Sequence, residues 1–193
     1  MPSPSKEGEK DVYGVERCRV SCGRVGIMMA SRPWVVGQVM ETEQFGPDDA
    51  VGIDMFAPFD QRLVDLLCME QEPRGMKIQI KSERGKENRF RHKHKEEILN
   101  LASGENIFVF NGQEKESIML ATLVGQIVAM ASLSGSIPER LMLDFMANDL
   151  HDEKAVLAYI KHREYLLRNK WFKRWLDGSI YNEEEQWAPK LLI

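Results

Sequence analysis

The chain has 193 residues, of which 43% are hydrophobic, which is enough for one well-cored domain or for one domain with an appendage. Its three cysteines, Cys18, Cys22 and Cys68, are too few for a disulfide framework, so we expect free thiols in a reducing, cytoplasmic compartment. We expect no secretory signal in the polar N-terminus and no membrane partner, because the longest uncharged run, residues 117–135, is too polar for a membrane span.

The net charge of −4 is unevenly distributed along the chain. Residues 74–95 hold nine Lys or Arg and two Glu, and residues 154–174 hold seven Lys or Arg and one Glu. Such segments in an acidic protein indicate local anion-binding surfaces, or else they neutralise acidic segments within the fold or across an oligomer. We favour anion binding for residues 74–95 and leave both interpretations open for residues 154–174.

The first third of the chain predicts a helix followed by two strands. Residues 11–30 place a stripe of Val, Cys and Arg at helical spacing, so we expect a helix that ends near Ser31-Arg32-Pro33. Residues 34–45 are rich in Val and aromatic residues and predict a strand. A Gly-Pro-Asp-Asp turn leads to the next predicted strand, residues 51–56.

The middle of the chain predicts a short helix, two further strands and another helix. The short helix starts in residues 57–60, and its buried face would comprise Leu63, Val64, Leu66 and Leu67. Residues 76–82, MKIQIKS, alternate apolar and polar side chains, so this strand places Gln79 and Lys81 on one face. The sequence also predicts a helix at residues 96–102 and a buried strand at residues 107–110.

The last third of the chain predicts three helices. The first covers residues 114–133, and the second runs from a capping box at Ser136–Glu139 to Asn148. The third begins at an Asp152 cap and ends near Leu176, before Gly178. The first two are apolar enough to require a sheet face or a second copy of themselves, so we expect a homo-oligomer formed through these C-terminal helices.

Two short motifs, Gly52-Ile53-Asp54 and Gln79-Ile80-Lys81, together resemble the PD-(D/E)XK nuclease superfamily, in the variant whose second motif reads Gln-x-Lys. The resemblance covers residues 14–112, and the order of elements matches as well. A first helix bears an acid, which maps to Glu16, and strands carrying Asp54 and then Gln79 and Lys81 follow it. In this chain Gln79 stands where the family usually has an acid.

The resemblance implies an α/β fold: a restriction-endonuclease-like mixed sheet flanked by helices at residues 11–112. An all-helical appendage would then occupy residues 113–180, and residues 181–193 would form a tail. It also implies a metal-dependent endonuclease that hydrolyses phosphodiester bonds of DNA.

The resemblance assigns a role to each residue of the two motifs. Asp54, Gln79 and the Ile80 backbone carbonyl would hold Mg²⁺ or Mn²⁺, because Mg²⁺ prefers oxygen ligands and keeps several waters. Lys81 would orient or deprotonate the attacking water and offset charge in the transition state, and Glu16 would complete the site.

Basic residues directly after Lys81 would contact a phosphate backbone, with DNA favoured over RNA as the partner. These residues are Arg84, Lys86, Arg89, Arg91, Lys93 and Lys95. The alternative from another class is a non-catalytic nucleic-acid-binding or assembly protein that uses residues 74–95 and 154–174. A third hypothesis is a structural subunit whose basic segments meet acidic protein.

Overall fold

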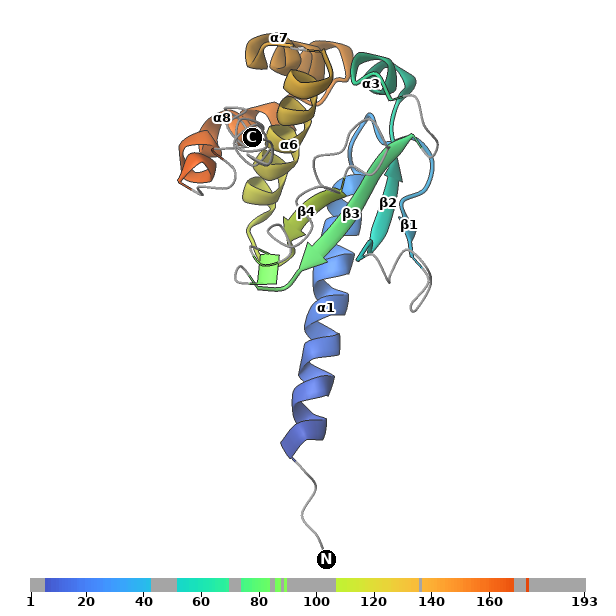
Figure 1. The fold of residues 1–193 in the computed structure, drawn as a ribbon, viewed down its shortest axis with the longest axis vertical. Helices are drawn as coiled ribbons and strands as arrows, with labels where there is room; N and C mark the ends of the chain where they lie inside the picture. Colours follow the sequence, from blue (N-terminus) through green and yellow to red (C-terminus); the bar gives the residue numbers. More distant parts are fainter. Residues whose placement is uncertain are drawn as a thin grey trace, which may run out of the picture.

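A four-stranded mixed sheet flanked by helices organises the described part of the chain (Figure 1). The computed structural model describes residues 6–42, 52–69, 74–83, 86–87, 89, 107–135, 137–168 and 173. The expectation of an α/β protein is confirmed. The predicted helix at residues 96–102 and the tail at residues 181–193 lie outside the described residues.

The sheet has the strand order β1-β2-β3-β4. Its strands are β1 (Met40–Glu41), β2 (Met55–Pro58), β3 (Gly75–Lys81) and β4 (Ile107–Asn111). The β1–β2 and β2–β3 pairs are antiparallel, whereas β3 and β4 are parallel. β3 confirms the predicted alternation, because Met76, Ile78 and Ile80 are buried while the flanking lysines are half-buried.

The predicted strand at residues 34–45 is mostly wrong over residues 34–42, the part that the structure describes, because regular pairing there is confined to β1. Residues 43–45 lie outside the described residues. Val35 forms an isolated bridge with Phe59, and pairing resumes at Met40 opposite Phe56. Between these two pairs, the segment before β1 has more residues than β2 has, and the extra residues form a bulge. Gly37 takes up the bulge with a φ of +80°, a conformation that glycine adopts without a steric penalty.

The first helix, α1 (Lys6–Ala30), confirms the predicted helix and begins earlier in the chain than expected. Its C-terminal half packs against the sheet, where an added Cβ at Gly26 would lie 3.4 Å from the Met55 side chain. Its N-terminal half projects beyond the sheet (Figure 1). The short helix α3 (Gln61–Leu66) is capped by Asp60 and buries Leu63 and Val64.

The C-terminal helices are α6 (Glu116–Gly135), α7 (Glu139–Asp144), the π-helix η1 (Phe145–Asp149) and α8 (Glu153–Leu167). α6 covers the outer edge of β4, where the buried Gln126 side chain accepts a hydrogen bond from the Val109 N–H at 3.0 Å. The apolar surface of α6 is therefore buried within the chain itself. None of the helices in the described ranges has the length and hydropathy of a membrane span.

Two predicted caps have different outcomes. Asp152 caps α8 as predicted, accepting a hydrogen bond from the Ala155 N–H at 3.2 Å. The capping box predicted at Ser136–Glu139 is wrong, because Pro138 occupies the N-cap of α7 without a side-chain hydrogen bond. The Glu139 carboxylate instead accepts hydrogen bonds from Tyr159 and Arg163 on α8.

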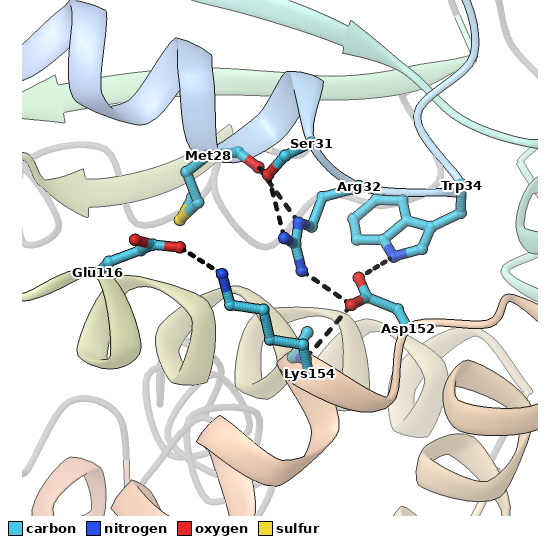
Figure 2. Close-up of polar contacts among 8 residues, drawn as sticks. Met28, Ser31, Arg32, Trp34, Glu116, Asp152 and Lys154 are labelled. Atoms are coloured by element: carbon cyan, nitrogen blue, oxygen red, sulfur yellow. Dashed lines mark hydrogen bonds and ion pairs between the residues drawn. The ribbon is translucent and has the colours of Figure 1, made fainter.

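A buried ion pair joins the end of α1 to the start of α8 (Figure 2). Arg32 Nη1 lies 2.8 Å from Asp152 Oδ1, and Trp34 Nε1 donates to Asp152 Oδ2 at 2.8 Å. Both charged residues are at most 5% exposed. The sheet and the C-terminal helices contribute to one hydrophobic cluster.

Candidate metal and catalytic site

Asp54 lies immediately before β2, and hydrogen bonds to both neighbouring strands fix its backbone. Its N–H donates to the Ile78 carbonyl at 2.8 Å, and its carbonyl accepts from the Thr42 N–H at 3.1 Å. The prediction of a strand over residues 51–56 is thus partly wrong, since β2 begins only at Met55. The ladder nevertheless holds Asp54 between β1 and β3.

The side chains of Asp54 and Gln79 meet, although 25 positions separate them in the sequence. Asp54 Oδ2 accepts a hydrogen bond from Gln79 Nε2 and another from the Ile80 N–H at 2.5 Å. Gln79 Nε2 also donates to the Ile80 carbonyl at 3.2 Å. Gln79 is 2% exposed, and its Oε1 is buried without a hydrogen-bond partner. A buried polar oxygen without a donor is costly.

Lys81 ends β3 two residues after Gln79, on the same face of the strand, and is half-buried. Its carbonyl accepts a hydrogen bond from the Gly112 N–H at 2.9 Å. Arg24 of α1 holds the same turn by donating to the carbonyls of Gly112 and Glu114 at 2.5 and 2.6 Å. The turn after β4 and the helix α1 therefore fix the backbone around Lys81.

Cys22 is the residue of α1 whose surroundings include Asp54. Burial raises the pKa of the Cys22 thiol to about 12, and the Cys18 thiol and the carboxylates of Asp54 and Glu41 add to the rise. The thiol is neutral at ordinary pH and is a poor nucleophile. The second acid in these surroundings is Glu41 of β1, whereas Glu16 is exposed on α1 and is not part of the Asp54–Gln79 contact.

The first basic segment is described only in part. Arg84, Arg91, Lys93 and Lys95 lie outside the described residues. Lys86 and Arg89 are both exposed, and Lys86 Nζ lies 3.2 Å from Glu83 Oε1.

The second basic segment is partly neutralised within the fold. Lys154 forms an ion pair with Glu116 at 2.8 Å, and Arg163 forms one with Glu139 at 2.7 Å. Lys161, Arg168 and Lys173 are exposed. For Lys154 and Arg163 the structure supports the interpretation that basic residues offset acidic ones inside the protein.

The candidate metal ligands at this site come from one carboxylate, one side-chain amide and one backbone carbonyl, and not from a cluster of acidic side chains. Within the described ranges, no group of three or more His, Cys, Asp or Glu side chains could hold a metal ion. The Asp54 carboxylate, the Gln79 amide oxygen and the Ile80 carbonyl oxygen form a mixed set that such a group does not include. In the structure the Gln79 amide nitrogen, and not its oxygen, faces the Asp54 carboxylate and the Ile80 carbonyl.

Comparison of the chain with protein-family models, curated proteins and solved structures finds no match. The interpretation of this site therefore depends on its geometry alone.

Sequence reasoning missed Glu41 and Cys22 as neighbours of the site. Glu41 lies next to Thr42, whose N–H donates to the Asp54 carbonyl, so correct pairing of β1 with β2 would have placed it there. Cys22 belongs to the predicted stripe of α1 and packs against the core, but its position near Asp54 depends on how the helix lies on the sheet.

Proposed function

We propose that the chain is a metal-dependent endonuclease of the PD-(D/E)XK type that hydrolyses phosphodiester bonds of DNA. The observation that carries the proposal is the convergence of Asp54, Gln79 and the Ile80 backbone at one point on β3. Strand topology is consistent with it, because a helix, three antiparallel strands and a fourth strand parallel to the third occur in the expected order.

The Gln79 amide supports a cation at this point. Its NH₂ group lies between Asp54 Oδ2 and the Ile80 carbonyl, two oxygen acceptors, while its own oxygen is buried without a donor. Half a turn of the amide would bring Oε1 beside the other two oxygens, while Asp54 Oδ2 would keep its hydrogen bond from the Ile80 N–H. A hard divalent cation would then have three oxygen ligands at this point, and the amide NH₂ would take the buried position that Oε1 leaves.

Each residue then has a distinct task. Asp54, Gln79 and the Ile80 carbonyl would hold Mg²⁺ or Mn²⁺, which supplies charge stabilisation at the phosphoryl oxygen and acidifies a bound water. Lys81 orients the attacking water or accepts its proton and offsets negative charge on the phosphate. Lys86 and Arg89 contact the DNA backbone without reading its sequence. Glu41 or Glu16 would supply a second carboxylate.

Cleavage of plasmid DNA by the purified full-length protein tests the proposal. We expect cutting with Mg²⁺ or Mn²⁺, none with EDTA, and a loss of about 10²–10⁴-fold in rate for Lys81→Ala, the range for removal of a general base. Asp54→Ala is expected to abolish metal-dependent cutting. Protein that cuts no DNA with either metal, or cutting that survives both substitutions, would contradict the proposal.

A matched control is available on the same strand. Lys77 lies on the same face of β3 as Lys81, nearer the start of the strand, and is also half-buried. If Lys81 acts chemically, Lys77→Ala changes the rate by less than about tenfold, because only an electrostatic contribution is lost. Equal losses for the two lysines would show that Lys81 contributes charge alone.

The non-catalytic alternative predicts salt-sensitive nucleic-acid binding that needs no metal and survives Asp54→Ala. It relies on the two basic segments, and the intrachain ion pairs of Lys154 and Arg163 weaken the case for the second one. DNA binding without any cleavage would favour this alternative.

A further inference from the structure

Two cysteines lie one helical turn apart on α1. Cys18 and Cys22 are four positions apart within one continuous helix, so their side chains project from the same face. Both are free cysteines, and Cys18 is exposed while Cys22 is half-buried. The remaining cysteine, Cys68, is also free and exposed, but it follows α3 instead of belonging to α1.

The two thiols of α1 are neighbours in space as well as in sequence. Burial raises the pKa of the Cys22 thiol to about 12, and the adjacent Cys18 thiol contributes to the rise through its charge and through a hydrogen bond. Cβ atoms at this helical spacing are roughly 5–6 Å apart, whereas a disulfide needs about 3.5–4.5 Å. The pair is therefore too widely spaced for a relaxed disulfide, and an ion held between the two sulfur atoms fits the gap better.

The number of available ligands restricts which ion can bind. Structural Zn²⁺ sites use four protein ligands. In the part of the chain that the structure describes, no three His, Cys, Asp or Glu side chains form a group that could hold a metal ion, so the thiol pair has no third ligand of this kind. The ion must then be satisfied by two sulfur ligands, and Cu⁺ meets this condition because it is selected by soft thiolates and accepts linear two-coordination.

We propose that Cys18 and Cys22 bind one Cu⁺ ion as a pair of thiolates on the surface of α1. Binding forms two Cu–S bonds and releases one proton from each thiol to solvent, and no electron is transferred. The complex carries one negative charge, which the nearby Asp54 and Glu41 carboxylates oppose and the Arg19 guanidinium offsets. Arg19 is exposed and lies three positions before Cys22, so it is a neighbour on the helix surface.

Competition for Cu⁺ between the purified full-length protein and the chromophoric chelator bicinchoninate tests the site, in anaerobic buffer with ascorbate. The wild type is expected to take one Cu⁺ per chain from the chelator. Cys18→Ser should weaken binding by about 10²–10⁴-fold, because only one thiolate of the chelating pair remains. Cys68→Ser should bind as tightly as the wild type. Cys18 and Cys68 are both exposed, so both variants should fold, and each keeps two thiols, so their comparison separates pairing from the number of thiols.

A second variant moves one thiol along the helix without reducing the number of thiols. Cys18→Ser combined with Val20→Cys keeps three cysteines, but side chains two positions apart do not face each other on a helix. Val20 is 47% exposed, so this variant should also fold, and it should bind Cu⁺ as weakly as Cys18→Ser alone.

Three results would overturn the proposal. The first is a wild type that takes no more Cu⁺ from the chelator than Cys18→Ser does. The second is an equal loss of affinity in Cys68→Ser, and the third is full binding restored by adding Val20→Cys to Cys18→Ser. None of these results depends on nuclease activity.

Discussion

Two buried polar side chains, Asp152 and Gln79, differ in how completely they are hydrogen-bonded. Asp152 is 3% exposed and receives hydrogen bonds from Arg32, Trp34 and the Ala155 N–H. Gln79 is similarly buried at 2% but leaves its Oε1 without a donor. The hydrogen bonds of Asp152 form a complete network, whereas those of Gln79 are incomplete, and this difference is why we propose Gln79 as part of a binding site.

The buried network predicts a large effect at one residue and a small one at its neighbour. Asp152→Ala leaves the Arg32 charge and the Trp34 N–H unpaired, so it should lower the free energy of unfolding by about 3–5 kcal/mol. Lys154→Ala breaks the exposed pair with Glu116 and should cost less than about 1 kcal/mol. Urea denaturation of both variants measures the difference, and equal losses would contradict the assigned role of burial.

Among the elements, α7 and α8 are held together by a titratable contact. Arg163 donates to both oxygens of Glu139, at 2.7 and 3.0 Å, and this pairing lowers the pKa of the Glu139 carboxyl from its ordinary value of 4.5. The Tyr159 hydroxyl donates to the same carboxylate at 2.7 Å and adds to the effect. A carboxyl whose pKa is lowered by folding stabilises the protein only while it is ionised.

The contact therefore predicts a pH-dependent loss of stability. It contributes fully above about pH 5.5, where the carboxyl is ionised in both states, and the contribution is lost as the pH falls through 4.5 and then through the lower folded-state pKa. Urea denaturation should show Glu139→Gln less stable than the wild type at pH 7. The gap should shrink steadily below pH 4.5, and a gap that stays constant down to about pH 3 would refute the assignment.

The elements also show what sequence patterns can and cannot predict here. The alternation in MKIQIKS, the apolar run IFVF and the Asp152 cap are local signals, and β3, β4 and the start of α8 lie where they indicated. The expected end of that helix near Leu176 is wrong, because α8 ends at Leu167. The strand predicted at residues 34–45 failed because its bulge is set by pairing with β2, which periodicity does not register.

The candidate site likewise combines features that local sequence patterns predict with features that only tertiary packing sets. The spacing within Gln79-Ile80-Lys81 predicted a shared face, and the resemblance predicted that Asp54 would join it; the Asp54 and Gln79 side chains are in contact, while their roles stay predictions. Glu41 and Cys22 reach the same surroundings only through the packing of β1 and α1, a tertiary arrangement that no local pattern specifies.

At the scale of the whole molecule, the proposed DNA binding predicts different effects for two pairs of basic residues. Removing Lys86 and Arg89 together should weaken binding to all DNA sequences alike and reduce the slope of log K against log salt by about 2. Removing Lys154 and Arg163, which pair with Glu116 and Glu139, should leave the slope unchanged. Fluorescence anisotropy with a labelled duplex over a range of salt concentrations measures both, and an unchanged slope for the first pair would exclude these contacts.

Anomalous diffraction from crystals soaked in Mn²⁺ tests most directly whether Asp54, Gln79 and the Ile80 carbonyl bind a divalent metal ion. We predict a peak between the three oxygens, with the Gln79 amide turned so that Oε1 faces the ion, and no peak in Asp54→Ala crystals. A map without a peak at this position, in which Gln79 still donates its hydrogen bond to Asp54, would contradict metal binding at this site.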